Sequence, residues 1–190
     1  MNNVWGLILA CALIYGAYGT LMGVVPGIVL SQTAPSPHLA PLAPAQDHGR
    51  EIYVAEGCSY CHTQNVRPLQ QDLVFGRPST AGDYAYSTPQ LLGTERTGPD
   101  LTNIGARQPS DVWQYLHLWN PRSVVSGSIM PSYRWLFAVK AKADPGDTVV
   151  AVPPAFAPAS GVVITTRDAQ DLVAYLKSLK QVPLGNGPSQ

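Results

Sequence analysis

The chain has 190 residues, and its 12 lysines and arginines balance 12 aspartates and glutamates, which gives a formal net charge of zero. This balance excludes a strongly basic nucleic-acid binder and an acidic tail protein, so no nucleic-acid partner is expected. The three cysteines, an odd number, do not fit a scaffold of paired disulfides. Every charged residue lies at or after Asp47, which leaves a long uncharged N-terminal segment.

The N-terminal segment contains an uncharged, apolar run from Val4 to Leu30. A helix rises about 1.5 Å per residue, so this run would reach about 40 Å, against about 30 Å for the hydrocarbon core of a bilayer. We therefore expect residues 1–30 to form one tilted transmembrane anchor. A signal peptide fits less well, because the run is about twice the usual length and no Lys or Arg precedes it. Cys11 lacks the basic leader of a lipoprotein signal and is expected to be an apolar filler.

Three glycines recur at every fourth position of this run, at Gly19, Gly23 and Gly27. Small residues at this spacing let a second membrane helix approach closely, although glycine is also common in membrane helices in general. We expect this face to pack against a partner subunit. Pro26 is expected to kink the outer end of the helix.

A proline-rich stretch follows, and we expect residues 31–47 to form a linker. Such composition favours an extended polyproline II conformation, which over sixteen residues spans about 50 Å. The linker would hold a soluble domain, expected at residues 48–183, away from the membrane, and residues 184–190 would form a C-terminal tail. His38 and His48, on or beside the linker, are expected to be surface residues.

One motif carries the chemistry, the CxxCH sequence from Cys58 through Cys61 to His62. This spacing is typical of c-type haem attachment, because two thiols one helical turn apart reach the two vinyl groups of a porphyrin. The next residue, His62, then supplies an imidazole nitrogen to the iron. A zinc site needs four ligands, yet the only other cysteine is Cys11 in the membrane segment. A dithiol redox centre would need a βαβ context, which is missing here.

Covalent haem c also predicts the orientation of the chain. In bacteria this group is attached on the outer side of the energy-transducing membrane. We therefore expect a cytoplasmic N-terminus, a single pass through the inner membrane and a periplasmic haem domain.

The second axial ligand is predicted to be Met130, the one methionine outside the membrane run and the initiator. Its turn-forming neighbours place it in a loop that could close over the far face of the haem. Competing ligands are His117, His48 and His38, or an open site. Ligation by His and Met closes both axial positions and raises the reduction potential, which favours electron transfer over oxygen chemistry.

Three helices are predicted around the haem, at His48–Gly57, Asp111–Asn120 and Thr166–Lys180. Ser110 is the expected N-cap of the second helix, and Thr165 with Asp168 resembles a capping box before the third. The predicted apolar stripes are Val112, Tyr115, Leu116 and Trp119 in the second helix, and Ala169, Leu172, Val173, Leu176 and Leu179 in the third.

Other features of the domain are less regular. His117 lies off the stripe of the second helix. It could reach a haem propionate, but a solvated or hydrogen-bonded role is expected. The segments Thr148–Val152 and Gly161–Thr165 favour strands, and either a small hairpin or a flexible loop is compatible with them. Residues 48–139 contain seven arginines and no lysine. One or two of these arginines are expected to pair with haem propionates.

The order of helix, CxxCH motif, loop, methionine and helix resembles class I cytochrome c. The resemblance implies a mainly α fold with long loops, in which the first and last helices cross. Gly49 and Tyr53 would then contact Tyr175 and Leu176. It also implies that the carbonyl of Pro99 binds the second nitrogen of the haem-ligating histidine.

A closer resemblance is to the mono-haem subunit II of cbb3-type cytochrome c oxidases. Over residues 48–137 it is carried by Gly49-Arg50-Glu51-Ile52-Tyr53, Glu56-Gly57-Cys58, His62-Thr63-Gln64-Asn65-Val66-Arg67-Pro68, Arg96-Thr97-Gly98-Pro99-Asp100-Leu101, His117-Leu118, Asn120-Pro121-Arg122 and Ser128-Ile129-Met130-Pro131-Ser132-Tyr133. Within these motifs, Arg96 and Tyr133 are expected to bind the cofactor together with Pro99. The sequence after Leu136 departs from the pattern of that subunit.

This resemblance implies a membrane-anchored electron-transfer subunit that is not an enzyme by itself. It would relay electrons from a periplasmic donor, such as a cytochrome c, to the catalytic subunit of a haem–copper oxidase. Alternatives are the cytochrome c subunit of a related nitric oxide reductase and a free-standing membrane-anchored shuttle. A haem enzyme or sensor with a labile sixth ligand is a third alternative.

Overall fold

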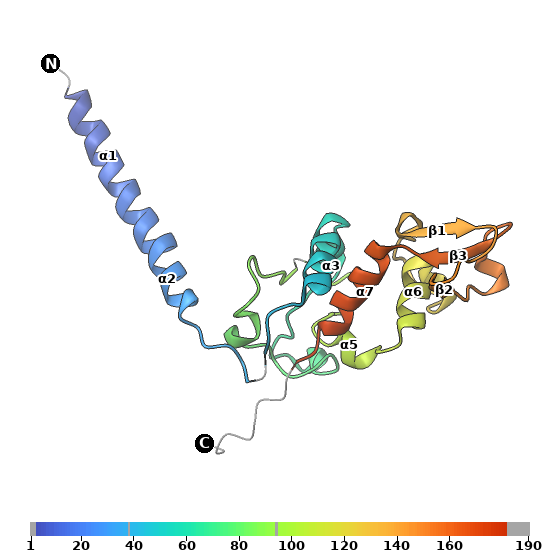
Figure 1. Cartoon of the computed structure of the whole chain (residues 1–190). Helices are drawn as coiled ribbons and strands as arrows, with labels where there is room; N and C mark the ends of the chain where they lie inside the picture. The colour runs from blue at the N-terminus through green and yellow to red at the C-terminus, as the bar shows by residue number, and fades with distance from the viewer. Residues whose placement is uncertain (1–2, 38, 94, 182–190) are drawn as a thin grey trace.

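The structure is a computed structural model that describes residues 3–37, 39–93 and 95–181. The expected tail at residues 184–190 and His38 lie outside the described residues. A free N-terminal helix leads into a globular part made mainly of helices and loops, with one small sheet at its far end (Figure 1). The mainly α fold with a single N-terminal apolar helix is therefore confirmed.

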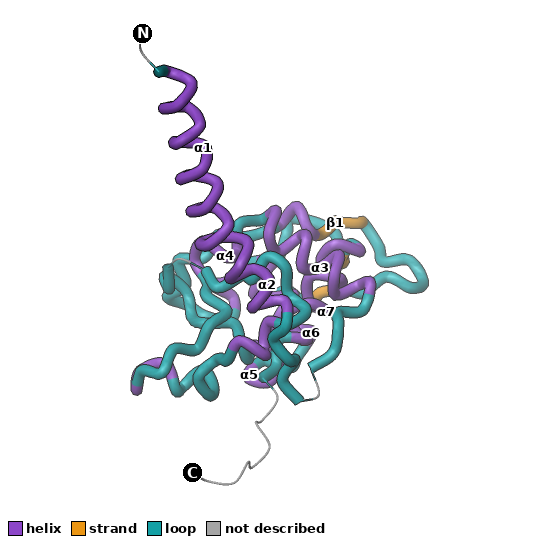
Figure 2. The backbone as a smooth tube through the Cα atoms, turned by 90° about the vertical axis from the view of Figure 1, so that its left-hand side faces the viewer, coloured by secondary structure: helices purple, strands orange, loops and turns teal. Residues whose placement is uncertain are grey.

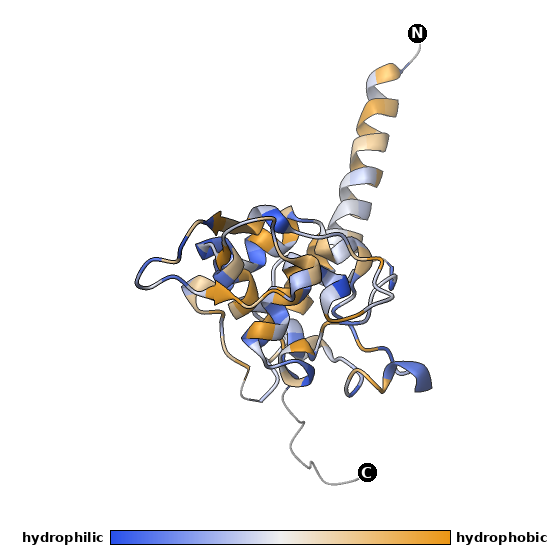
Figure 3. Cartoon of the chain, turned by 90° about the vertical axis from the view of Figure 1, so that its right-hand side faces the viewer, coloured by the Kyte–Doolittle hydropathy of each residue, from blue (hydrophilic) through white to orange (hydrophobic). Residues whose placement is uncertain are grey.

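The N-terminal helix runs without a break from Val4 to Ser31 and is long and apolar enough to cross a membrane. It consists of α1 (Val4–Gly19), a five-residue π-helical turn (Thr20–Val24) and α2 (Val25–Ser31). Its residues range from pale blue to orange on the hydropathy scale, whereas strongly blue, hydrophilic segments lie in the globular part (Figure 3). No side chain of this helix is buried by the rest of the described chain.

The π-helical turn stands where a kink was expected. Pro26 has no N–H to donate, and its ring would collide with the carbonyl of the residue four positions earlier in a regular helix. The helix instead widens just before the proline, and the Val25 N–H bonds to the carbonyl of Thr20.

The segment after the membrane helix is docked on the globular part, which corrects the expectation of a free spacer over residues 31–47. Ser36 is buried, and its N–H donates to the carbonyl of Gly82 at 3.0 Å. Its hydroxyl donates to Asp83 at 2.7 Å. Helix α3 (Pro44–Ala55) also begins four residues before the expected His48, because proline is favoured at the first helical position.

Helices α3 and α7 (Arg167–Ser178) cross side by side, as expected (Figure 1). Gly49 makes the crossing possible, because a Cβ there would lie 1.9 Å from the carbonyl oxygen of Asp171. Tyr53 packs edge-on against Tyr175 with ring centroids 5.4 Å apart. Both rings are buried, so the crossing is a main part of the hydrophobic core.

Two details of these helices differ from expectation. The N-cap of α7 is Thr166, whose hydroxyl accepts from the Ala169 N–H at 3.3 Å, so the predicted cap at Thr165 is one residue early. His48 Nδ1 lies 2.8 Å from Asp171 of α7, so its half-exposed ring joins the two helices.

Helix α6 (Asp111–Trp119) begins at the predicted N-cap Ser110, but its buried face is rotated from the predicted stripe. Val112 is 57% exposed, whereas Gln114 and Leu118 are buried. Two shorter helices complete the set, α4 (Cys58–Cys61) and α5 (Ile104–Arg107).

The small sheet is antiparallel, with strand order β1-β3-β2. Strand β2 (Val149–Val150) pairs with β3 (Val162–Thr165), which decides in favour of the hairpin. The edge strand β1 (Phe137–Lys140) was not predicted. Phe137 packs edge-on against Trp119 of α6, with centroids 5.7 Å apart, and so joins the sheet to the helical core.

Long loops fill much of the rest of the globular part (Figure 2). Their described residues include short 3₁₀ turns, namely Gln70–Asp72, Ala81–Tyr84, Pro121–Ser123, Arg134–Leu136 and Pro154–Phe156.

Candidate haem site

The CxxCH motif lies on a single helical turn directly after α3. Gly57 has a φ of 70°, a left-handed conformation that glycine adopts freely, and it turns the chain from α3 into α4. The His62 N–H donates to the carbonyl of Cys58 at 3.0 Å and closes the turn. Cys58 is half-buried, and burial raises the pKa of its thiol to about 12, whereas Cys61 is exposed. Both thiols are free and one turn apart.

The imidazole of His62 is held by one hydrogen bond. Its Nδ1 donates to the carbonyl oxygen of Pro99 at 2.8 Å, which leaves Nε2 as the nitrogen free to bind a metal. Burial lowers the pKa of His62, and the Pro99 carbonyl acts in the opposite direction. A neutral imidazole is the form that ligates iron.

The segment that carries Pro99 is fixed against the CxxCH turn by its backbone. The Gly98 N–H donates to the carbonyl of Cys61 at 2.8 Å, and the Leu101 N–H donates to that of Thr63 at 2.8 Å. A Cβ at Gly98 would lie 2.3 Å from Cε1 of His62. Only glycine therefore lets the chain pass this close to the imidazole.

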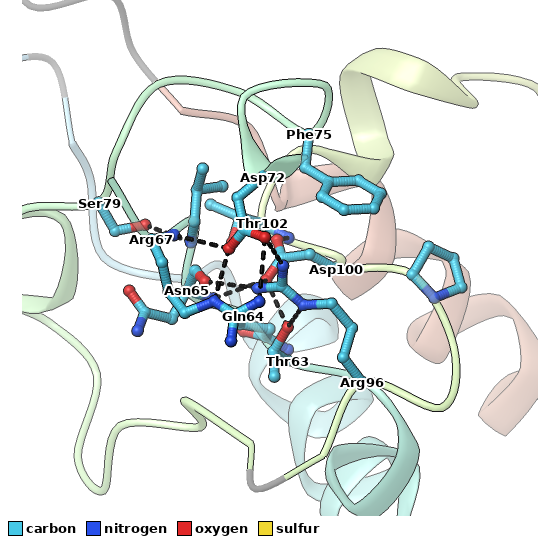
Figure 4. Close-up of polar contacts among 12 residues, drawn as sticks. Thr63, Gln64, Asn65, Arg67, Asp72, Phe75, Ser79, Arg96, Asp100 and Thr102 are labelled. Carbon is cyan, nitrogen blue, oxygen red and sulfur yellow. Dashed lines mark hydrogen bonds and ion pairs between the residues drawn. The ribbon is translucent and has the colours of Figure 1, made fainter. Parts of the chain in front are cut away.

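Behind His62, a buried polar network anchors the same segment (Figure 4). Asp100 is fully buried and accepts from the Thr63 hydroxyl at 2.6 Å and from the Asn65 N–H at 2.9 Å. Arg96 donates from Nε to the Thr63 hydroxyl at 3.0 Å and from Nη2 to the Asn65 carbonyl at 3.0 Å, and it pairs with Asp72. The network ties the residues after His62 to the loop that holds Pro99.

Asp72 is the second buried carboxylate of this network. Hydrogen bonds from Arg67 hold the pKa of Asp72 far below its usual range, and Arg96 adds to the effect. The ring of Phe75 lies under both Arg96 and Arg107, with guanidinium carbons 5.4 and 5.2 Å from its centroid. The structure thus places Arg96 among carboxylates behind His62.

A largely apolar cavity lies on the other side of the CxxCH turn. Its walls come from α3, α4, α5, α6, α7 and two loops. Its lining residues are Tyr53, Cys58, His62, Pro99, Leu101, Ile104, Trp113, Gln114, His117, Leu118, Met130, Leu172 and Leu176. Four of the predicted site residues line it, namely Cys58, His62, Pro99 and Met130. Cys61, Arg96 and Tyr133 are not among the lining residues.

Met130 reaches the cavity from a loop that is tied to α6. The Tyr133 N–H donates to the carbonyl of Leu118 at 2.8 Å, and the Met130 N–H donates to the Ser128 hydroxyl at 3.3 Å. Tyr133 itself is buried in the core and packs edge-on against Trp135 at 5.2 Å. Its backbone therefore positions the methionine loop.

His117 does not take the solvated position that was one of its expected roles. Its ring lines the cavity and stacks on Trp113 one turn earlier, with centroids 4.7 Å apart and planes 13° from parallel. Burial, with a smaller effect of the nearby His62, lowers the pKa of His117 to about 4. Within the described residues, its buried Nδ1 has no hydrogen-bond partner.

Arg107 is a second residue whose place sequence reasoning did not single out. It follows Ile104 of the cavity wall by one turn and donates to the carbonyl of Asp100. Its Nε is buried and has no hydrogen-bond partner in the described part of the chain. The one sequence signal was its membership in the set of seven arginines.

These residues fit a haem and do not fit a zinc site. Among residues 3–37, 39–93 and 95–181, no three His, Cys, Asp or Glu side chains gather as metal ligands. The site offers two free thiols, one available imidazole nitrogen, a thioether and apolar walls. The unpaired Nδ1 of His117 and Nε of Arg107 would meet polar atoms of the cofactor or its ligands.

A comparison with protein families gives an independent result. The family model of the cytochrome c oxidase mono-haem subunit, FixO, matches residues 2–153. The match includes the membrane helix and the linker as well as the haem motifs, and it ends before β3 and α7. No curated protein sequence matches the chain closely enough to count as a relative. The match spans most of the chain, which therefore belongs to the FixO family of mono-haem cytochrome c oxidase subunits.

Proposed function

We propose that this chain carries one covalently attached haem c and is the electron-entry subunit of a membrane-bound haem–copper oxidase. The observation that carries the proposal is that His62 and Met130 line one apolar cavity beside the CxxCH turn. Membership in the FixO family supports an oxidase complex as the setting.

Cys58 and Cys61 would attach the cofactor. Each thiol adds across one vinyl group, so that sulfur bonds to one vinyl carbon and the hydrogen goes to the other. His62 would bind the iron through Nε2, with its ring held by Pro99, and Met130 would bind through its sulfur. Arg107, with its buried and unpaired Nε, is better placed than Arg96 to hold a propionate.

When bound, the haem supplies reversible one-electron chemistry between ferrous and ferric iron. His62 and Met130 would occupy both axial positions, which leaves none for oxygen and favours electron transfer. The apolar walls exclude water and favour the reduced, less charged state. The chain would thus accept an electron from an external donor and pass it to the catalytic subunit.

The membrane helix would fix the subunit beside its partner. Its surface is unburied, and the space around Gly19, Gly23 and Gly27 is open. Because haem c is attached outside the cytoplasm, we place the N-terminus in the cytoplasm and the haem domain in the periplasm.

Purification from native membranes in mild detergent tests the function. We expect a reduced-minus-oxidised spectrum with b-type haem beside haem c, and oxygen consumption with a cytochrome donor. Consumption of nitric oxide in place of oxygen would assign the chain to a nitric oxide reductase. A c-type spectrum alone would contradict the oxidase proposal and favour a free-standing shuttle.

The mass of the purified chain tests covalent attachment. The wild-type chain should carry the added mass of one haem after denaturation, and Cys11→Ser should retain it. Cys58→Ala combined with Cys61→Ala should lose it. Retention of the added mass in this double variant would contradict attachment through the CxxCH motif.

A further inference from the structure

His117 lines the same cavity as Met130, and the role inferred for it rests on the proposed haem ligation. Helix α6 has two faces that contact the interior of the domain. One face packs into the core through Tyr115 and Trp119, and the other lines the cavity with Trp113 and His117. His117 is therefore the one residue with an ionisable ring that α6 contributes to the haem cavity.

The imidazole of His117 is fixed in place but unsatisfied. Stacking on Trp113 sets the plane of the ring and hence the direction of its nitrogens. The neighbouring polar group Gln114 is paired, because its amide donates to the carbonyl of Gln108 at 2.9 Å. Within the described residues, Nδ1 of His117 is buried without a partner. A buried polar atom left unpaired is costly, so a group that enters the cavity should pair with it.

The methionine loop is tied to α6 at the residue that follows His117 in the chain. Leu118, the residue after His117, accepts the hydrogen bond from the Tyr133 N–H at 2.8 Å, three residues after Met130. His117 and Met130 line the same cavity as His62, whose Nδ1 is already engaged with Pro99. The propionate position is better matched by Arg107, which is attached to the Pro99 loop through the Asp100 carbonyl.

We propose that His117 is a positioning residue for the sixth ligand, and that its Nδ1–H donates a hydrogen bond to the sulfur of Met130 in the haem-bound protein. The hydrogen bond withdraws electron density from the sulfur. The sulfur then donates less well to ferric iron, which favours the ferrous state and raises the reduction potential.

The test compares full-length, haem-loaded wild type with His117→Phe and His117→Gln. A hydrogen bond of about 1 kcal/mol corresponds to about fivefold in an equilibrium. We expect His117→Phe to lower the reduction potential and to bind added imidazole at the ferric iron about fivefold more weakly. The sulfur-to-iron charge-transfer band should shift. His117→Gln keeps a donor and should stay closer to wild type, and Val112→Ala on the exposed face of α6 should match wild type.

Two outcomes would overturn the inference. If His117→Phe is loaded with haem and keeps the potential, the charge-transfer band and the imidazole affinity of wild type, His117 does not contact the ligand. If the potential shifts while the charge-transfer band and imidazole affinity stay unchanged, the hydrogen bond goes to a propionate instead. Failure of the underlying ligation would be distinguishable, because wild type itself would then lack the sulfur-to-iron band.

Discussion

His62 donates a hydrogen bond from Nδ1 to the carbonyl oxygen of Pro99, 37 positions further along the chain, at 2.8 Å. Such a bond fixes the ring of a metal-ligating histidine and makes its other nitrogen more basic. The contact depends on the absence of a side chain at Gly98 and on the buried network around Asp100. The geometry of the proximal ligand is therefore set by residues that do not touch the iron.

Replacement of Gly98 by Ala tests this dependence. A Cβ at this position would lie 2.3 Å from Cε1 of His62, so the imidazole or the Pro99 segment has to move. We expect a large loss of covalently bound haem, measured by the pyridine haemochrome spectrum per mole of chain. Gly127→Ala is a matched control, because a Cβ there meets no atom within 4 Å. Equal haem content in both variants would show that the close approach is not required.

Replacement of Met130 by Ala tests the sixth ligand. Without the thioether, the iron should have an open position, so the reduced protein should bind carbon monoxide and the reduction potential should fall. Ile129→Ala is the control, since this neighbouring side chain is 75% exposed. If the potential and the haem spectrum of Met130→Ala equal those of wild type, another residue is the ligand.

Local motifs could be predicted from the sequence, whereas the place of His117 in the wall of the cavity could not. The CxxCH turn is formed by consecutive residues, so its spacing alone gives its geometry. A periodicity argument assumes one buried face per helix. It therefore assigned no place in the interior to His117, which lies off the apolar stripe. Helix α6 has a second face, half-buried at Trp113 and His117, that lines the cavity, and a polar ring is compatible with that position.

The linker and the small sheet show a second limit of sequence reasoning. A proline-rich composition favours extended backbone but does not reveal docking, which here depends on contacts of Ser36 with residues 82 and 83. Strand β1 was missed because its register with β3 is a long-range pairing, Phe137 with Thr165. Arg96 was assigned to the cofactor, yet nothing local in the sequence indicated its carboxylate partners Asp72 and Asp100.

Arg96→Leu should destabilise the domain more than it changes the haem. The substitution removes a cation from beside the fully buried Asp100, and an uncompensated buried charge costs about 3–5 kcal/mol. Thermal or denaturant unfolding measures the loss, and the potential of the folded variant should stay close to that of wild type. Arg167→Leu is the control, because its side chain is 83% exposed and such pairs contribute about 0–1 kcal/mol. A large change in the reduction potential with an unchanged free energy of unfolding would instead indicate that Arg96 pairs with a haem propionate.

The docking of the linker should depend on acid pH through Asp83. Burial alone raises the pKa of this carboxyl, but hydrogen bonds from Arg77, from the Thr80 N–H and from Ser36 outweigh burial and lower it to about 2. Because the pKa is lower in the docked state, the ionised carboxylate stabilises docking. That contribution is complete above the ordinary pKa near 4 and is lost as the pH falls towards about 2.

The NMR resonance of the Ser36 amide reports on this docking. We expect it to move between about pH 4 and pH 2 in wild type and to be already displaced at neutral pH in Asp83→Asn. Asp144→Asn, at a carboxylate that is 71% exposed, should behave like wild type. A wild-type resonance that stays unchanged over this range would show that Asp83 does not hold the linker.

Gly23→Leu tests whether the membrane helix packs against a partner subunit. In the described chain a Cβ at Gly23 meets no atom within 4 Å, so the larger side chain causes no clash within the subunit itself. Against a closely packed partner helix, however, it would force the two backbones apart. We therefore expect haem loading of the chain to be retained and the yield of co-purified b-type haem to fall. Ala17→Leu adds a side chain of the same size on the opposite face, two residues before Gly19, and should keep the complex intact. A yield of b-type haem that equals that of wild type in both variants would exclude the glycine face as the contact.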